Sequence, residues 1–299
     1  MKTAAFVFAA LAVQTAQFRV GVDAVRVDAL VMDGGKPVVG LGAEDFEVRD
    51  SGVVQTIESV AIADVPISMM IALDTSESVS GRTLQELKDG VGAAVAALQP
   101  TDRAALIAFS TDVRLKIDWG QDHASLVDAV SRLRAGGGTS LWDATFAALT
   151  FSDETPAVRR LVLVFSDGED TSSWLPWTAV IDKARRGDAV VYAIEIRNTS
   201  APRARTLQNR SGVWTTYKDT SSREQAFLDE LSEISGGAAY TIADAGELRK
   251  AFARVLTEFR TRYLITYMPR GVDQPGWHPL EVTLKTQRGK ISARRGYLR

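Results

Sequence analysis

The sequence contains no cysteine and only two histidines among its 299 residues. The absence of cysteine excludes disulfides, thiolate zinc sites and cysteine nucleophiles, and two histidines argue against a histidine-rich metal centre. A strong excess of charge of one sign is also missing, since the formal net charge is -2 at pH 7 and the pI is about 5.8. The charge balance therefore gives no electrostatic argument for binding nucleic acid or an anionic membrane.

The sequence also lacks an apolar run long enough to span a bilayer as a helix. The run nearest to one, Ala4 to Val13, follows Met1-Lys2 and precedes small residues, with candidate cleavage sites at Ala10-Leu11-Ala12 and Ala16. A basic start, a short apolar core and small residues are the layout of a secretory signal. We therefore predict a signal peptide over residues 1–16 and a secreted or periplasmic protein. The alternative is an alanine-rich N-terminus without a targeting role.

The two ends of the remaining chain have the pattern of β-strands. Residues 18–64 alternate apolar and polar positions, with turn signals at Asp33-Gly34-Gly35-Lys36 and Asp50-Ser51-Gly52. Residues 262–299 contain three stretches that we expect to be strands, Tyr263–Tyr267, Leu280–Leu284 and Ile291–Leu298, separated by Pro- and Gly-rich turns. Because neither segment has enough strands for a stable core of its own, we predict that they pair into one small β-sandwich.

The segment between them, residues 66–260, alternates continuous apolar runs with stretches of helical spacing. Four runs have the character of strands buried in a parallel sheet: Ser68–Leu73, Ala104–Phe109, Leu161–Phe165 and Ala189–Ile194. The hydrophobic content of 45% is ample for a core of this kind. These features predict a doubly wound α/β domain with a mainly parallel sheet, inserted between the two halves of the sandwich.

Oxygen-bearing side chains follow the first buried run. Residues 74–78 read Asp-Thr-Ser-Glu-Ser, which places one carboxylate and two hydroxyls, those of Asp74, Ser76 and Ser78, at alternating positions. Alone, this sequence is common in turns and helix caps, since Asp and Ser satisfy exposed backbone donors. Its position after a buried strand adds weight, because ligands of doubly wound sheets bind at the carboxyl ends of the strands.

Two later segments are expected at the same edge of the sheet. Thr139 follows a glycine triplet whose backbone can approach closely, and Asp167 comes after the third apolar run. With Asp74, Ser76 and Ser78 they supply two carboxylates and three hydroxyls. Hard cations such as Mg²⁺ prefer oxygen ligands, and Mg²⁺ readily retains water in unfilled positions. The sequence therefore predicts a divalent-cation site formed by these five residues.

The three segments Asp74–Ser78, Gly138–Asp143 and Ser166–Gly168 resemble the metal-ion-dependent adhesion site of von Willebrand factor A domains. The resemblance covers roughly Pro66 to Phe259. It implies that the hydroxyls bind the cation, that the aspartates bind directly or through water, and that the ion is Mg²⁺, with Mn²⁺ or Ca²⁺ as alternatives. It also implies an adhesion-type module whose protein partner completes the coordination with an acidic side chain. Together with the predicted signal peptide and the lack of a histidine near the site and of a second aspartate at the position of Ser76, this leads us to expect an exported protein that is not an enzyme.

The flanking segments carry a second resemblance. Asp45–Gly52 and Ala293–Tyr297 are similar to the two ends of a bacterial VWFA-related family of exported proteins, and Gly236–Tyr240 and Tyr263–Pro269 match its spacing. This resemblance implies an architecture rather than a particular activity.

Three acidic residues lie beside the predicted ligands. We expect Asp143 to cap a helix or to form a hydrogen bond behind the ligands rather than to bind the cation directly. We expect Glu169 and Asp170 to form a solvated acidic rim that tunes the affinity for the cation.

The remaining notable side chains are the histidines and three tryptophans. We expect His123 to cap or decorate a helix start and His278 to lie in a turn, without a catalytic role for either. Trp142, Trp174 and Trp177 lie near the site loops in sequence, and they either pack at the rim or form an exposed recognition surface.

Two other functions remain open. The first is a metal-assisted hydrolase or phosphotransferase with Asp74 as nucleophile or Glu169 as general base. Against it, Ser76 stands where doubly wound phosphatases usually carry a second aspartate, and the sequence shows no phosphate-binding glycine motif. The second is a structural envelope protein in which the site is vestigial and the sandwich does the binding.

Overall fold

The computed structural model describes residues 24–62, 65–154, 159–167, 170–196, 205–208, 214–217, 221–242, 245–285 and 289–299. The predicted signal peptide, residues 1–16, lies outside that part of the chain. Among the described helices, none combines the length and the apolar character that a membrane crossing requires.

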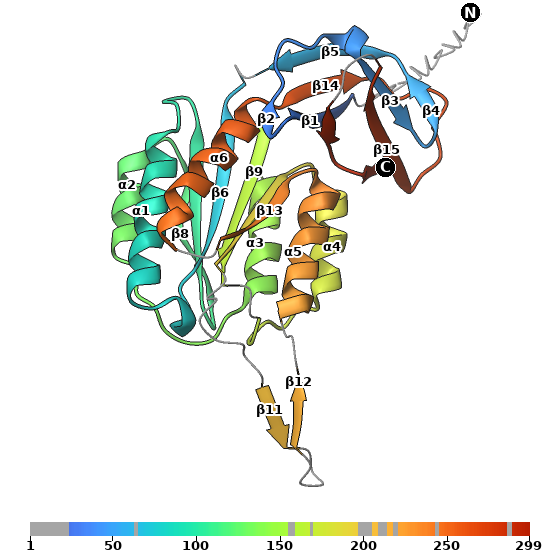
Figure 1. The fold of residues 1–299 in the computed structure, drawn as a ribbon. Helices are drawn as coiled ribbons and strands as arrows, with labels where there is room; N and C mark the ends of the chain where they lie inside the picture. Colours follow the sequence, from blue (N-terminus) through green and yellow to red (C-terminus); the bar gives the residue numbers. More distant parts are fainter. Residues whose placement is uncertain are drawn as a thin grey trace, which may run out of the picture.

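A six-stranded sheet forms the centre of the larger part of the molecule, with the strand order β13-β10-β9-β6-β7-β8 (Figure 1). Its strands are β6 (Ile67–Asp74), β7 (Arg103–Phe109), β8 (Val113–Gly120), β9 (Arg159–Ser166), β10 (Val190–Ile196) and β13 (Ala238–Ile242). Neighbouring strands run parallel except β8, which returns antiparallel to β7 at the edge. The predicted mainly parallel, doubly wound sheet is confirmed.

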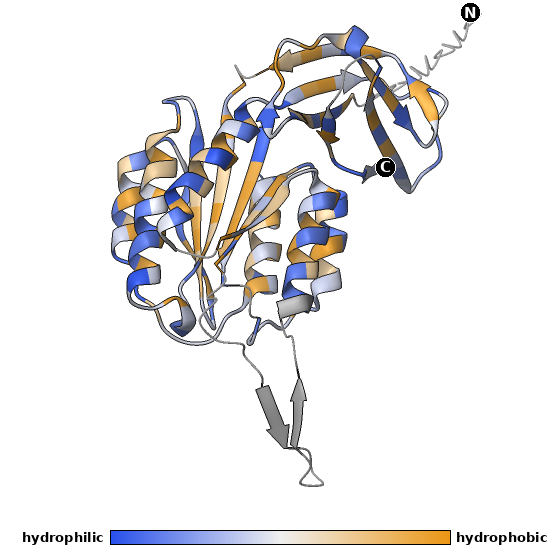
Figure 2. Cartoon of the chain, viewed as in Figure 1, coloured by the Kyte–Doolittle hydropathy of each residue, from blue (hydrophilic) through white to orange (hydrophobic). Residues whose placement is uncertain are grey.

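Three described helices cover each face of this sheet. One face carries α1 (Arg82–Ala96), α2 (His123–Ser131) and α6 (Leu248–Arg260), and the other carries α3 (Leu141–Asp153), α4 (Trp177–Arg186) and α5 (Ser221–Ser235). In β6, Met69 and Ile71 belong to the first core, and Met70 and Ala72 belong to the second. Burial on both faces explains why these strands read as continuous apolar runs, which Figure 2 shows in orange at the centre of the sheet.

The two terminal β segments pair with each other in two further sheets (Figure 1). One sheet has the order β16-β1-β14-β5, with β2 beside β1, and the other has the order β17-β15-β3-β4. The strands are β1 (Val25–Asp33), β2 (Lys36–Pro37), β3 (Phe46–Asp50), β4 (Val53–Gln55), β5 (Ile57–Ile62), β14 (Tyr263–Tyr267), β15 (Trp277–Leu284), β16 (Lys290–Ser292) and β17 (Gly296–Leu298). Short 3₁₀ helices are η1 (Ala43–Asp45), η2 (Glu77–Val79) and η3 (Ala245–Glu247).

Each of these sheets joins strands from both ends of the chain. β1 pairs with β14, and β3 pairs with β15, both antiparallel. The facing side chains form a third core, separate from the two cores of the central sheet, which includes Val27, Phe46, Val48, Tyr263 and Ile265. The prediction that the two segments complete one β-sandwich around the inserted α/β layer is confirmed.

Two details of the strand pattern differ from the sequence-based expectation. The run expected as one strand over 291–298 is two strands, β16 and β17, in different sheets. Between them, the backbone N–H of Arg295 donates to the carbonyl of Ile234 at the end of α5, so the chain contacts the α/β layer where it passes from one sandwich sheet to the other. A hairpin of β11 (Arg205–Gln208) and β12 (Trp214–Tyr217) lies in a stretch where no periodicity predicted an element.

Arg262 joins the α/β layer to the sandwich. Its side chain is fully buried, and Nη2 donates to the carbonyls of Asp28 at 2.8 Å, Gly236 at 2.6 Å and Ser292 at 3.0 Å. Nη1 donates to the hydroxyl of Tyr192 on β10 at 3.3 Å. Because these acceptors come from both parts of the molecule, one guanidinium holds the junction together.

Arg159, at the start of β9, makes a second link across the same junction. Its guanidinium is 1% exposed and pairs with Asp28 of β1, with Nη2 and Oδ1 3.1 Å apart. The same group lies over the ring of Phe259, 4.7 Å from its centroid, at the end of α6. The junction is thus charged and buried, a combination in which removal of one partner is costly.

We predict that Arg262→Met lowers the free energy of unfolding by about 3 kcal/mol or more, because several buried carbonyls lose their donor. Urea denaturation followed by circular dichroism measures the change. The matched control is Arg249→Met, on the exposed side of α6, which is expected to stay within about 0.5 kcal/mol of the wild type. A loss of less than about 1 kcal/mol for Arg262→Met would contradict the role assigned to this residue.

Candidate metal centre

Asp74 ends β6 at the carboxyl edge of the sheet, and its carboxylate is fully buried. Oδ1 accepts a hydrogen bond from the backbone N–H of Ser76 at 2.8 Å, and Oδ2 accepts one from the hydroxyl of Ser166 at 2.8 Å. Ser166 ends β9, the parallel neighbour of β6. The two strand ends are therefore joined through the Asp74 side chain.

Ser76 and Ser78 place their hydroxyl oxygens side by side. The two Oγ atoms are 2.9 Å apart, with Ser76 buried and Ser78 exposed. For a Mg²⁺ ion with ligands at 2.0–2.1 Å in an octahedron, neighbouring ligand oxygens are separated by about 2.8–3.0 Å. The spacing of these hydroxyls fits two adjacent positions of such an ion.

The glycine-rich loop is bonded directly to the loop after β6. The N–H of Glu77 donates to the carbonyl of Gly137 at 3.0 Å, and the N–H of Gly136 donates to the carbonyl of Thr75 at 2.9 Å. Gly137 has a positive φ of 84°, which favours glycine at this position. These bonds bring buried Thr139, two residues further on, to the edge where Asp74 ends its strand.

The loop after β9 is bonded to Thr139 in turn. The backbone N–H groups of Thr171 and Ser172 both donate to the carbonyl of Thr139 at 2.9 Å, and the N–H of Thr139 donates to Oγ1 of Thr171 at 2.9 Å. A Cβ at Gly138 would lie 2.2 Å from the hydroxyl of Ser172 and 2.9 Å from that of Thr171, so a larger residue would displace these hydroxyls. All three predicted segments thus meet at one edge.

The electrostatics of the site favour a cation. The pKa of Asp74 is raised to about 6, first by burial and second by the negative charge of Asp167, while hydrogen bonds from Ser76 and Ser166 act in the opposite direction. Asp167 follows β9 directly and is half-buried. Two carboxylates that repel each other in a partly desolvated site both gain from a neighbouring positive charge.

The donor set consists of oxygen atoms, which suits Mg²⁺, Mn²⁺ or Ca²⁺ better than a soft metal ion. Within the described residues, no three His, Cys, Asp or Glu side chains form a cluster that could hold a metal ion. A cation at this edge would therefore depend on Ser76, Ser78 and Thr139 as well as on Asp74 and Asp167. The residues present fit a hard divalent cation held by few charges.

Asp143 and Asp170 are engaged in the scaffold of the loops. Oδ1 of Asp170 accepts from the N–H of Leu141 at 2.8 Å, at the start of α3, and burial raises the pKa of this carboxyl. The carboxylate of Asp143 accepts from the N–H groups of Trp174 and Leu175, each at 2.9 Å. The loop after β9 thus caps the start of α3 through Asp170, and α3 in turn holds that loop through Asp143. Glu169, expected beside them as part of an acidic rim, lies outside the described residues.

The two histidines lie away from this edge. Nε2 of His123 contacts the carbonyl of Asp102, which precedes β7 and so lies at the opposite edge of the sheet. The expectation that His278 lies in a turn is wrong, because it is part of strand β15 and is buried inside the sandwich. Its Nδ1 is 3.1 Å from Oδ1 of Asp50, and its Nε2 is 2.7 Å from the carbonyl of Gln274. Neither side chain is placed to act on a group bound at the predicted cation site.

The three tryptophans near the site divide into two kinds. Trp142 and Trp177 pack edge-on against Phe227 of α5, with ring centroids 6.4 and 6.3 Å apart. Trp174 is 93% exposed. The sequence left two alternatives open for these tryptophans. Trp142 and Trp177 are packed, whereas Trp174 is exposed.

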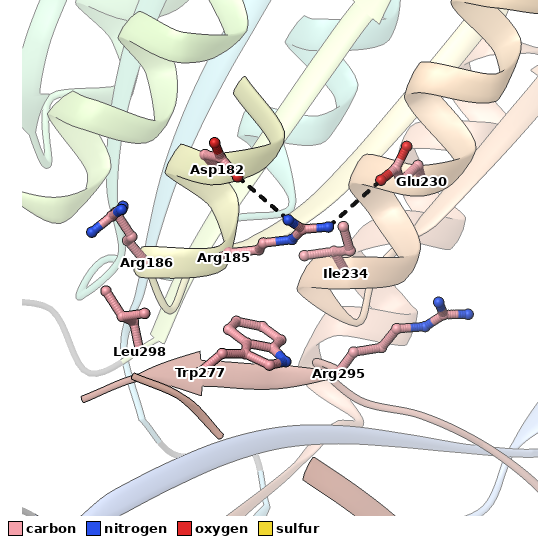
Figure 3. Close-up of a pocket in the computed structure, with 8 residues that line it drawn as sticks. All are labelled: Asp182, Arg185, Arg186, Glu230, Ile234, Trp277, Arg295 and Leu298. Atoms are coloured by element: carbon pink, nitrogen blue, oxygen red, sulfur yellow. Dashed lines mark hydrogen bonds and ion pairs between the residues drawn. The ribbon is translucent and has the colours of Figure 1, made fainter. Parts of the chain in front are cut away.

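A separate hollow of about 610 Å³ lies between the helices α4 and α5 and the sandwich strands β15 and β17 (Figure 3). Trp277 and Leu298 form its apolar side. Arg185 projects into it and pairs with Asp182 at 3.4 Å and Glu230 at 4.0 Å. It contains none of the predicted cation ligands, and its central arginine is already engaged, so we assign it no part in the site.

Residues 69–169 match the family model of the von Willebrand factor type A domain. This segment of the chain is therefore similar to von Willebrand factor A domains, and it includes all five predicted ligands. A curated relative, "Uncharacterized protein sll0103" from Synechocystis sp., is 30% identical over 79 residues, which are 26% of this chain. The aligned segment spans only 19% of the length of that relative.

Solved structures share the fold. The von Willebrand factor type A protein from Catenulispora acidiphila aligns with a TM-score of 0.54 and 14% identity, covering 90% of this chain and 76% of its own. Proximal thread matrix protein 1 from the mussel byssus, solved with a zinc-occupied MIDAS motif, aligns with a TM-score of 0.53 and 14% identity, covering 70% of this chain and 49% of its own. At such identities the similarity establishes the α/β fold of von Willebrand factor A domains.

Sequence reasoning missed the residues that position the predicted ligands. Ser166 holds Asp74, Thr171 holds Thr139, and Ser173 accepts the N–H of Trp142 at 3.1 Å while it donates to Asp170 at 2.6 Å. The only available signal was the cluster of hydroxyl residues on either side of Asp167, which reads equally well as an ordinary polar loop.

We predict that Asp74→Asn stabilises the protein in the presence of a chelator at pH 7.5 but not at pH 4. Folding raises the pKa of Asp74 from 3.8 to about 6, so the folded state binds this proton more tightly than the unfolded state. The contribution of Asp74 to stability is therefore present below pH 4 and is lost as the pH rises through 6. A pKa shift of this size corresponds to a destabilisation of about 3 kcal/mol when Asp74 is ionised in the folded protein. Because Asn cannot ionise, the substitution removes this destabilisation at high pH.

Urea unfolding of both proteins in EDTA at the two pH values measures this effect. Asn retains an oxygen for the N–H of Ser76, so the variant keeps the local turn. The control is Asp112→Asn, an exposed residue in the neighbouring loop, which is expected to change stability little at either pH. Equal or lower stability of Asp74→Asn at pH 7.5 would contradict the prediction.

Proposed function

We propose that this protein binds a divalent cation, Mg²⁺ in the first instance, at the carboxyl edge of the α/β sheet and uses it to bind an acidic group of a protein partner. Ser76, Ser78 and Thr139 supply hydroxyl ligands, and Asp74 and Asp167 act directly or through water. The observation that carries the proposal is the 2.9 Å spacing of the Ser76 and Ser78 hydroxyls, in a loop that also holds a buried carboxylate.

The small number of ligands suggests how a partner would bind. Mg²⁺ takes six oxygen ligands, and five side chains supply at most five of them if each binds through one atom. At least one position is therefore available to water or to a carboxylate of a partner. Because the donors carry two negative charges at most, a bound dication keeps its attraction for one more anionic group.

The comparisons support this proposal in part. The structure of proximal thread matrix protein 1, which has the same fold, carries zinc in its MIDAS motif. This favours a divalent cation at the corresponding edge here, with Mn²⁺ and Ca²⁺ as alternatives to Mg²⁺. The signal peptide predicted over residues 1–16 supports the further proposal that the protein acts outside the cytoplasm, as an exported adhesion-type module.

The two alternative functions are less well supported. A nucleophile must reach the substrate atom directly, whereas a carboxylate can hold a cation through water. The Asp74 carboxylate is fully buried and both of its oxygens accept hydrogen bonds, which disfavours the nucleophile of a hydrolase. A general-base role for Glu169 falls outside the described residues. A structural protein with a vestigial site remains the stronger alternative, and it is the one that cation binding tests.

We predict that purified protein binds Mg²⁺ or Mn²⁺ with one ion per chain by isothermal titration calorimetry. At a cation concentration one hundred times the Kd, the free energy of unfolding should rise by about 2.7 kcal/mol, and EDTA should reverse the rise. Thr139→Ala and Ser76→Ala should lose both the heat of binding and the stabilisation, because each removes a ligand.

The matched control is Thr150→Ala, the same change on α3, where the hydroxyl donates to the carbonyl of Phe146 instead of facing the site. This variant should bind the cation as the wild type does. Absence of cation uptake by the wild-type protein would favour the vestigial site. Partner binding that persists unchanged in EDTA would refute coordination of the partner through the metal.

A further inference from the structure

Trp174 is the most exposed of the large hydrophobic side chains in the described part of the chain, with 93% of its surface open to solvent. Its two neighbours in the same region of the sequence, Trp142 and Trp177, pack against Phe227. A tryptophan carries a large apolar surface that folding normally buries, at least in part. Such an exposed side chain is a candidate contact for another molecule.

The backbone that carries Trp174 is fixed by hydrogen bonds. Its own N–H and that of Leu175 donate to the two oxygens of Asp143 at 2.9 Å. The preceding residue, Ser173, accepts from the N–H groups of Trp142 and Asp143 at 3.1 and 3.2 Å. The loop is therefore clamped onto the start of α3. An indole held outward on a rigid support loses little freedom on contact, which favours binding.

The backbone that carries this indole lies near the predicted cation site. Ser172 donates its N–H to the carbonyl of Thr139 at 2.9 Å, and Trp174 is two residues further along the chain. Since consecutive Cα atoms are 3.8 Å apart, the Cα of Trp174 is at most about 7.6 Å from that of Ser172. In an extended peptide bound to this surface, side chains two positions apart would be about 6.6 Å from each other. One bound peptide could therefore reach both the cation site and Trp174.

We propose that Trp174 is a recognition anchor for the partner of the cation site. The partner is a protein or peptide that places an acidic side chain on the bound cation and, within a few residues of it, an aromatic or large aliphatic side chain against the indole. This inference rests on the proposed function, which it deepens by naming the second feature of the partner.

An apolar neighbour fits this surface better than a cationic one. If the partner packed a lysine or arginine side chain against the indole, its positive charge would lie near the bound dication and be repelled by it. The bound cation would also compete with that lysine or arginine for the partner's own acidic side chain. Buried aromatic anchors, in contrast, are typical centres of binding energy in interfaces, and tryptophan is among the most frequent of them.

The test uses a displayed library of random peptides, selected on the full chain in Mg²⁺. We expect the selected peptides to combine an Asp or Glu with an aromatic or large aliphatic residue within about four positions. For a synthetic peptide from this set, Trp174→Ala should weaken binding at least about tenfold, and Trp174→Phe should weaken it less. The matched control is Trp277→Ala, a half-exposed tryptophan on the sandwich, which should not change the affinity.

The outcomes separate this proposal from the proposed function. Binding that requires Mg²⁺ but is unchanged in Trp174→Ala overturns the anchor and leaves the cation site standing. Binding that persists in EDTA yet depends on Trp174 keeps the anchor and refutes metal coordination. Selected peptides with Lys or Arg in place of the apolar residue, or no peptide that depends on Trp174, also overturn the proposal. Thermal midpoints of the variants verify that they are folded.

Discussion

The arrangement of the predicted cation site depends on one constraint, the fully buried carboxylate of Asp74. It ends a strand covered by helices on both faces, so solvent cannot satisfy its oxygens, and the protein must do so. Ser76 closes the following turn onto one oxygen, and Ser166 reaches the other from the next strand. The glycine loop then bonds to this turn, and the loop after β9 bonds to the glycine loop. One desolvated group thereby sets the positions of three loops.

Most of the fold could be predicted from the sequence, because its signals are local. Continuous apolar runs indicated buried parallel strands, helical spacing indicated the layers that cover them, and alternation indicated the sandwich. The rest depends on contacts between distant segments. Between β16 and β17 the chain is bonded to Ile234 through Arg295, and the junction forms where carbonyls of distant segments meet around Arg262. No local pattern in the sequence contains that information.

The candidate site shows the same division. Spacing after strand ends was enough to predict that Asp74, Thr139 and their neighbours share one edge, and the hydrogen bonds of the loops bring those segments together. Spacing could not predict the hydrogen bonds by which Asp170 caps α3 and Asp143 holds the loop after β9. It also could not predict that Trp174 is exposed while Trp142 is packed. That difference arises because Phe227, on a helix far along the chain, covers one indole and leaves the other exposed.

The way the α/β layer is inserted has a consequence for modularity. Ile62, the last residue of β5, is paired with Tyr263, the first residue of β14. Paired Cα atoms in antiparallel strands are only about 5 Å apart. All the residues between Ile62 and Tyr263 therefore take the place that a hairpin loop would have in the sandwich. The entropic cost of closing a loop rises only with the logarithm of its length. The sandwich can therefore carry inserts of very different size, and a change of insert exchanges the binding edge while the frame that holds it stays the same.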